Sequence, residues 1–154
     1  YHDNLGTFET EPGVNGLFRF TRFLANLRQR HETLQQKYYG DLVPDDRDVS
    51  YLFHTPSLEE HPQDGDRALS VYINSPGDNF LMMVNMADAQ VTFNAPTPAE
   101  GRVWRRLIDT GVWAEPAENS WPEGEGMVLD GATQVQPWSV VVWHDSPVLA
   151  DDAG

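Results

Sequence analysis

Carboxylates are the side chains of this sequence best suited to acid–base chemistry, because 24 Asp and Glu residues stand against 10 Lys and Arg residues. Two pairs of neighbouring carboxylates could in principle act as a general acid and a general base: Glu59 with Glu60, and Glu123 with Glu125. Both pairs lie in stretches rich in Pro, Gly and acidic residues, which predicts exposed loops. Hydrated carboxylates keep ordinary pKa values. We therefore interpret these pairs as solvated side chains.

The five histidines offer no local metal or catalytic motif. None stands in an H-E-x-x-H pattern, and His144, Asp145 and Ser146 are contiguous, so we do not expect those three side chains to converge as a catalytic triad. The acidic stretch from Asp41 to Asp48 lacks the residue order and the glycine of an EF-hand loop. The sequence thus predicts no metal site and no cofactor, and it argues against nucleophilic catalysis.

The tryptophans could stack against sugar rings if their faces are exposed. Trp113 and Trp121 lie in a long acidic stretch from Asp109 to Gly126, which makes them candidate glucan contacts. The alternative is that their rings cover the edge of the fold or pack against a neighbouring domain. The remaining three fall in predicted strands and are expected in the core: Trp104, Trp138 and Trp143.

A long amphipathic helix precedes the rest of the chain. Apolar side chains, with one histidine among them, recur at steps of three and four: Leu17, Phe20, Leu24, Leu27, His31, Leu34 and Tyr38. With Asn15 as N-cap and Gly40 as a stop, this pattern predicts a helix from about Gly16 to Tyr38. The stripe must bury against a sheet or a missing neighbour, and His31 is expected to form a buried hydrogen bond.

The remaining chain has the pattern of short strands separated by turns. Ser75-Pro76-Gly77-Asp78 fits a type II turn, which needs positive φ at the glycine. Residues 69–74, 80–85 and 90–95 are predicted to form a three-stranded antiparallel meander, and residues 55–67 an exposed loop. Residues 138–143 are apolar on both faces and hence suit a central strand. Further strands are expected at residues 49–54, 102–108, 127–129 and 133–136. The sequence therefore predicts a mainly β fold, an antiparallel β-sandwich of about seven strands preceded by one helix.

Charge and composition exclude several partners. The net charge is −14, and the stretch from Leu107 to Gly154 contains no Lys or Arg, so the sequence predicts no nucleic-acid partner and no membrane partner. Neutral ligands such as sugars are compatible with this field. The chain contains no cysteine, which is typical of a cytoplasmic protein. At 154 residues it is too short for a complete β/α barrel, which takes about 250 residues.

The order of several motifs resembles the C-terminal end of isoamylase and glycogen debranching enzymes of the α-amylase superfamily. The first motif is F-x-x-F-L-x-x-L-R-x-x-H, from Phe20 to His31. It is followed by Leu69-Ser70-Val71-Tyr72-Ile73-Asn74, Val84-Asn85, Trp104-Arg105-Arg106-Leu107-Ile108-Asp109-Thr110 and Ser139-Val140-Val141-Val142-Trp143. In that family the last barrel helix carries an arginine and a histidine near its end, and an all-β domain follows.

The resemblance implies that residues 1–40 are the end of a catalytic barrel with its last helix, that residues 41–150 form the all-β domain, and that residues 151–154 are a disordered tail. The parent would be a retaining glycoside hydrolase that cleaves α-1,6 branch points of glycogen-like glucans. Its catalytic carboxylates lie on barrel strands, so no residue here is assigned to catalysis and the chain alone is expected to be inactive. The residues expected to pack between the domains are Phe20, Leu24, Leu27, His31 and Leu34.

The expected partner is therefore the barrel of the parent enzyme, which the sandwich would stabilise. A second reading makes the chain an autonomous carbohydrate-binding module that binds α-glucan through the loop with Trp113 and Trp121. If the helix stripe stays uncovered, we also expect self-association, since large exposed apolar patches are rare on monomers.

Overall fold

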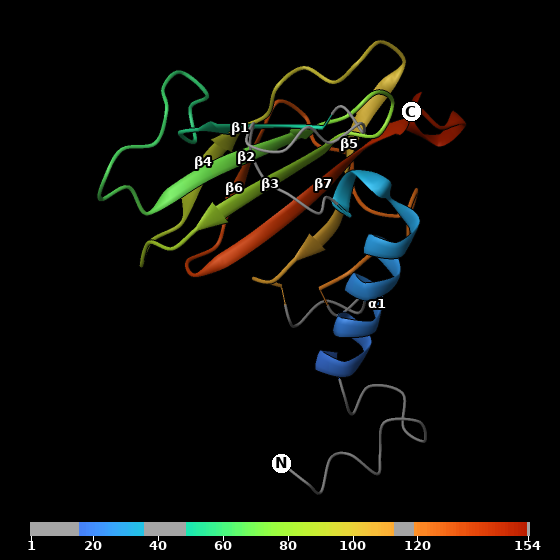
Figure 1. Cartoon of the computed structure of the whole chain (residues 1–154), viewed down its shortest axis with the longest axis horizontal. Coiled ribbons are helices and arrows are strands. Elements are labelled where there is room, and N and C mark those ends of the chain that lie inside the picture. The colour runs from blue at the N-terminus through green and yellow to red at the C-terminus, as the bar shows by residue number, and fades with distance from the viewer. Residues whose placement is uncertain (1–15, 36–48, 113–118, 154) are drawn as a thin grey trace, which may run out of the picture.

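A computed structural model describes residues 16–35, 49–112 and 119–153 (Figure 1). The fold is mainly β, as predicted, with antiparallel pairing throughout. Within the described part, no helix combines the length and the apolar character needed to cross a membrane. The elements are α1 (Gly16–Arg30), η2 (Glu32–Leu34), β1 (Ser50–His54), β2 (Ala68–Asn74), β3 (Phe80–Asn85), β4 (Val91–Asn94), β5 (Arg102–Asp109), β6 (Ala132–Val135), β7 (Ser139–Pro147) and η3 (Ala150–Ala153).

Two antiparallel sheets form the sandwich. The larger has the strand order β1-β2-β3-β7-β5, and the smaller pairs β4 with β6. The predicted meander is wrong in its third strand, because β4 leaves β3 and joins β6, while β7 takes the place beside β3. The buried Asn85 links the end of β3 to the end of β6, since its Nδ2 donates to the carbonyl oxygens of Ala89, Val135 and Gln136 at 2.9–3.0 Å.

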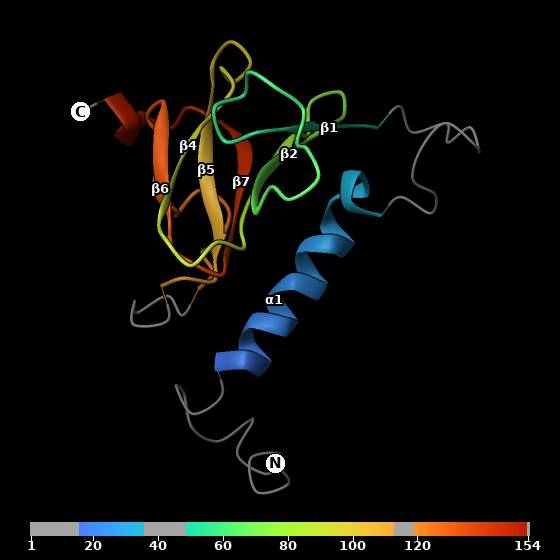
Figure 2. The ribbon, with the colours of Figure 1, turned by 90° about the vertical axis from the view of Figure 1, so that its left-hand side faces the viewer.

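Both faces of the larger sheet are covered. Figure 2 shows α1 on one side of this sheet and β4 with β6 on the other. Alternate residues of one strand therefore enter different cores, as they do in β7, which is central as predicted. The core beneath the smaller sheet contains Leu81, Met83, Phe93, Trp104, Leu129, Val135, Val141 and Trp143. The core beneath the helix contains Leu27, Ile73, Phe80, Leu107, Ile108 and Val142.

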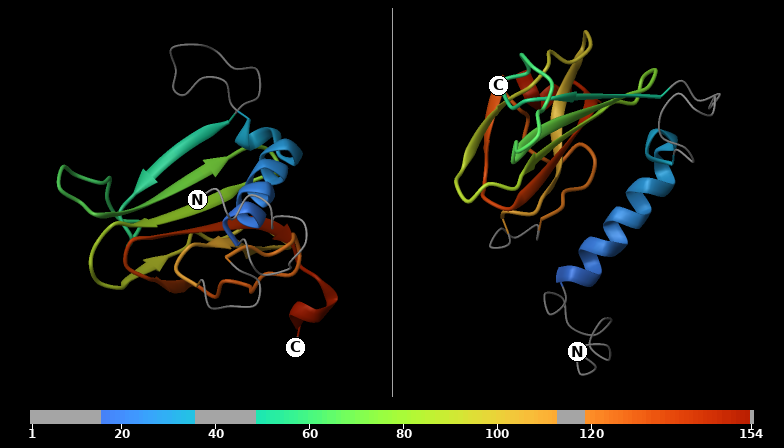
Figure 3. Two further views of the ribbon diagram at one scale, coloured as in Figure 1. Left: turned by 90° about the horizontal axis from the view of Figure 1, so that it is seen from below. Right: turned by 60° about the vertical axis from the view of Figure 1, so that its left-hand side comes forward.

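The helix is shorter than predicted. It ends at Arg30, and His31 is extended (φ −114°, ψ 108°) ahead of the 3-10 turn η2. The side chain of His31 is held by groups of the β domain, as described below, and this orientation takes the chain out of the helical path. Of the apolar stripe, Leu27 is buried and Phe20 and Leu34 are partly buried, whereas Leu24 is 37% exposed. Figure 3 shows the helix running obliquely beside the sheet.

Two further expectations are wrong. Trp104 and Trp143 lie in the core as predicted, but Trp138 is 64% exposed with a positive φ of 54° in the turn before β7. Residues 127–129 do not form a strand of either sheet, and Val128 makes only an isolated bridge to Arg105. Asn15, Tyr38, Gly40, Trp113 and the acidic stretch Asp41 to Asp48 lie outside the described residues.

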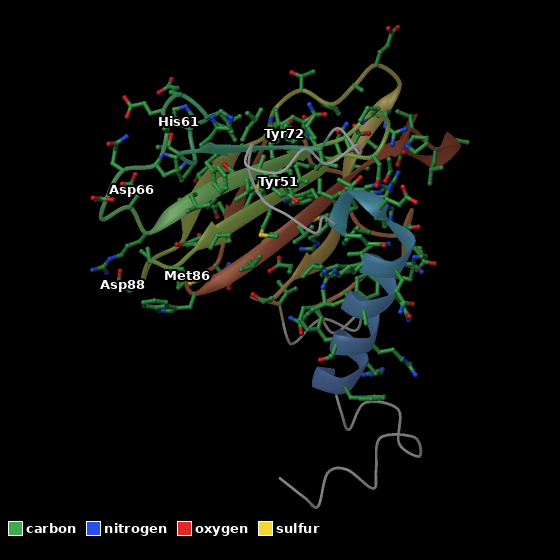
Figure 4. All side chains as sticks on the ribbon, in the orientation of Figure 1. Tyr51, His61, Asp66, Tyr72, Met86 and Asp88 are labelled. Carbon is green, nitrogen blue, oxygen red and sulfur yellow. The ribbon has the colours of Figure 1, made fainter. Side chains whose placement is uncertain are left out.

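Side chains at the sheet ends show how the turns are arranged. Figure 4 labels His61 and Asp66 in the loop between β1 and β2, where the predicted exposed segment lies. It also labels Met86 and Asp88 in the turn after β3. Because Asn85 pairs with Ser139, this turn and the exposed Trp138 share one end of the sheet. The opposite end of β3, where Phe80 pairs with His144, is where the helix end docks.

Candidate functional site

A polar cluster joins the end of α1 to the larger sheet, and the turn between β2 and β3 positions its central residue. The turn Ser75-Pro76-Gly77-Asp78 has the predicted form, with φ 78° at Gly77 and a hydrogen bond from the Asp78 amide to the Ser75 carbonyl (3.2 Å). It places the Asp78 carboxylate beside the helix end and β7.

Two histidines donate to the same oxygen of Asp78. His31 Nδ1 and His144 Nε2 each lie 2.9 Å from Asp78 Oδ1. The other oxygen, Oδ2, accepts from Thr33 Oγ1 at 2.6 Å. His31, Thr33, Asp78 and His144 thereby link η2 and the residue ahead of it to the sheet. The hydrogen bond predicted for His31 is therefore present, with a turn residue as its partner.

The outer nitrogen of each histidine also has a partner. His31 Nε2 donates to Glu123 Oε1 in a short hydrogen bond, and Arg30 lies 3.7 Å from that carboxylate. His144 Nδ1 lies 3.2 Å from Ser146 Oγ. Since His31 faces two carboxylates, they favour its charged imidazolium form. We call His31, Asp78, Glu123, His144 and Ser146 the His–Asp cluster.

Charge pairing shifts three pKa values in the cluster. The hydrogen bond to Asp78 raises the pKa of His31 against the opposing effect of burial, and Glu123 adds to the rise. Burial alone would raise the pKa of Asp78, but the hydrogen bonds from His144, His31 and Thr33 together hold it well below its usual range. In Glu123, burial is likewise outweighed by the hydrogen bond from His31, so its pKa is lowered.

These residues correct two expectations. Glu123 is not merely a solvated loop carboxylate, since it binds His31; Glu59, Glu60 and Glu125 are exposed as predicted. His144 and Ser146 do meet, because residues two apart share a face of a strand. Asp145 points the other way, where it pairs with Arg102 and accepts from Asn79 at 2.8 Å.

Ser146, His144 and Asp78 are hydrogen-bonded in series, the order found in nucleophilic triads. Ser146 is only 6% exposed, so its hydroxyl offers no accessible nucleophile to a substrate. The arrangement instead suits the docking of a helix, or the binding of a small cation among its converging atoms. The sequence signal for it is weak, because its members come from four separate segments, although His31 lies in the predicted helix stripe and Asp78 in the predicted turn.

The candidate glucan contacts lie elsewhere. Trp121 is partly buried, and the guanidinium of Arg106 covers one face of its ring at 3.9 Å from the centroid. Arg106 also donates to Asp109 at 3.2 Å. One ring face of Trp121 is therefore already engaged in a cation–π contact.

The strand and loop segment with these contacts matches a known family. Residues 59–142 match the family described as isoamylase, C-terminal. The chain belongs to the isoamylase C-terminal domain family. Most of the larger sheet and all of the smaller one lie within the matched residues, whereas α1, His31 and His144 lie outside them. No curated protein sequence matches this isoamylase C-terminal domain.

Solved structures that resemble the domain include several of MutB. A MutB variant from crystals soaked with trehalulose is 17% identical with a TM-score of 0.47, and the likeness covers 93% of this chain and 19% of that one. A variant in complex with the substrate sucrose is 18% identical with a TM-score of 0.47, covering 94% and 19%. A variant in complex with glucose is 18% identical with a TM-score of 0.44, covering 84% and 18%. The chain thus spans about a fifth of the length of these structures.

Proposed function

We propose that the chain is the non-catalytic C-terminal part of a debranching glycoside hydrolase of the isoamylase type, acting on α-1,6 branch points of glycogen-like glucans in the cytoplasm. In this proposal residues 1–40 end the catalytic barrel, α1 is its last helix, and the sandwich stabilises the barrel by holding that helix. Membership of the isoamylase C-terminal family supports the assignment of the β domain.

The observation that carries the proposal is that α1 docks on the sheet and still exposes apolar side chains. One side docks on the sheet through the buried Leu27 and the His–Asp cluster. Phe18 and Leu24 are 36% and 37% exposed, which leaves apolar surface for a further partner. A barrel helix held by the sandwich would bury this remaining apolar surface against the barrel. The same exposed surface makes self-association of the isolated chain an expected property, measurable by sedimentation.

The test compares the whole protein with this chain. Incubated with a branched glucan, the whole protein should release reducing ends from α-1,6 bonds, and the chain alone should release none above the blank. In the whole protein, Leu27→Ala should shorten the half-life of thermal inactivation while kcat stays unchanged, because truncating a buried leucine costs about 2–5 kcal/mol. Reducing ends released by the chain alone, or a whole protein inert toward α-1,6 bonds, would contradict the proposal.

One observation favours the second function, an α-glucan-binding module. Trp138 presents an indole that is 64% exposed, and Met86, 39% exposed, lies at the same end of the sheet, away from the His–Asp cluster. Exposed indole faces bind sugar rings. In native electrophoresis through glycogen, retardation that is lost in Trp138→Ala, Trp121→Ala or Trp113→Ala would support the module. If glycogen does not change the electrophoretic mobility of the chain, the binding module is excluded and the structural role remains.

A further inference from the structure

We propose that His31, Asp78 and His144 form a binding site for a divalent transition metal, with Zn²⁺ as the ion to test. Their candidate ligand atoms all lie within 4.8 Å of one another. The atoms are His31 Nδ1, Asp78 Oδ1 and His144 Nε2, and they already converge on one point as hydrogen-bond partners. The inference concerns this cluster alone and does not depend on the debranching assignment.

The donor set is the first reason. Two imidazole nitrogens and one carboxylate oxygen are the ligands of three-residue zinc sites, which leave a fourth position to water or another ligand. Imidazole favours zinc and its neighbours over magnesium and calcium, which prefer all-oxygen sites. The net charge of −14 also gives the chain a field that attracts cations.

The second reason for proposing a metal site is that hydrogen bonds to the other polar atoms of the three side chains fix their orientation. Histidines that bind metals commonly donate their second N–H to a carboxylate or another acceptor, which fixes the ring. Here Glu123 holds the outer nitrogen of His31, and Ser146 Oγ lies 3.2 Å from that of His144. Thr33 Oγ1 donates to Asp78 Oδ2, whereas both histidines contact Oδ1. All three inner atoms are thereby oriented toward the same centre.

The protons on the two histidines can be rearranged so that both inner nitrogens bind a metal. At present both imidazoles donate an N–H to Asp78 Oδ1. When a metal binds, His31 releases its Nδ1 proton to solvent and keeps the Nε2 proton that it donates to Glu123. His144 binds the metal through an Nε2 that carries no proton, and the proton on its Nδ1 is then donated to Ser146 Oγ. No outer hydrogen bond is lost in either step.

A metal at this centre would connect three segments of the chain. His31 follows α1, Asp78 lies in the turn before β3, and His144 belongs to β7. An ion bound to all three would lock the helix end onto the sheet, and binding to the folded state alone would raise its stability. The expected consequence is a domain whose thermal stability responds to zinc.

The experiment titrates the metal-stripped chain with Zn²⁺ in competition with a chromophoric chelator. We expect one saturable site. Asp78→Asn and His144→Gln should abolish it, and Glu123→Gln, which removes only an outer partner, should weaken it by about 10- to 100-fold. The matched control is the double variant His54→Gln/His61→Gln, which removes the other histidine pair of the β domain, with rings stacked 6.0 Å apart. It should bind zinc as the unaltered chain does.

A second measurement does not depend on the variants folding. In the unaltered chain, Zn²⁺ should shift the imidazole NMR signals of His31 and His144 and leave those of His54 and His61 in place. The proposal is overturned if no saturable binding is found. It is equally overturned if zinc shifts only the signals of His54 and His61, or if the His54→Gln/His61→Gln variant loses the site.

Discussion

Replacing Asp78 with asparagine should weaken the attachment of the helix end to the sheet. The carboxylate accepts hydrogen bonds from His31 and His144 at 2.9 Å and from Thr33 at 2.6 Å. Hydrogen bonds to charged groups contribute about 1.5–3 kcal/mol each. Asparagine keeps one acceptor oxygen, and the Asp78 side chain is 27% exposed, so part of the loss is recovered by the amide and by water. We expect the free energy of unfolding to fall by about 2–4 kcal/mol.

Equilibrium urea unfolding, followed by tryptophan fluorescence at pH 6 with a chelator present, measures this loss without any contribution from metal. The matched control is Asp88→Asn, since Asp88 is exposed in the turn after β3. Its effect should stay within about 0.5 kcal/mol. If Asp78→Asn is no more destabilising than Asp88→Asn, the His–Asp cluster does not hold the helix, and the reasoning fails.

The pH dependence of the same difference follows from the two pKa shifts. The raised pKa of His31 gives stability that is complete below its usual value of about 6.5 and is lost as the pH rises through the raised pKa. The lowered pKa of Asp78 gives stability that is complete above about 3.9 and is lost as the pH falls through the lowered pKa. The difference in the free energy of unfolding between the unaltered chain and Asp78→Asn should therefore be largest between about pH 4 and 6.5, and it should decrease toward pH 9. If the difference in the free energy of unfolding instead increases above pH 6.5, the assignment of His31 as an imidazolium is refuted.

Three further substitutions test the packing. Gly126→Ala would place a Cβ 1.8 Å from the Arg106 carbonyl oxygen, so the backbone must move, and we expect a loss of about 3 kcal/mol or more in urea unfolding. Arg102→Met leaves the carboxylate of Asp145, which is 1% exposed, without its ion-pair partner, and should cost about 3 kcal/mol in the same assay. Trp138→Ala removes an indole that is 64% exposed and should stay within about 0.5 kcal/mol, so it serves as the control for both. Equal effects of all three would contradict the packing described.

Local sequence patterns predicted where the strands lie better than they predicted which strands pair. Continuous apolar runs in residues 80–84 and 140–143 located β3 and β7, because such runs are typical of strands covered on both faces. The pairing of β4 with β6 escaped prediction, since sequence neighbours often pair and no local signal marks the exception. The amide of Asn85, which links the end of β3 to β6, has acceptors up to 51 residues away in the sequence, so no local pattern reveals it.

The candidate site was predictable only in part. The apolar stripe singled out His31, and burial in a polar pair was the expected reason. Asp78 stood in a recognisable turn, but nothing local indicated that two histidines would share its carboxylate. Closeness in sequence argues against a triad that includes His144 and Ser146, but strand geometry brings residues two apart onto one face. Clusters assembled from four segments leave no spacing motif for a sequence to reveal.

The helix α1 ends at Arg30, earlier than predicted, because apolar and polar contacts have different effects on it. Burial of Leu27 and its neighbours draws the apolar stripe of the helix to the sheet, but apolar contacts have no preferred angle and do not determine the residue at which the helix ends. The hydrogen bonds from His31 to Asp78 and Glu123 do have direction, and they require an extended backbone at that residue. The helical hydrogen bonds that would continue α1 beyond Arg30 are worth less than these charge-assisted bonds. Removing both partners of His31, as in Asp78→Asn with Glu123→Gln, should therefore let the helix extend past Arg30, which backbone NMR shifts would detect.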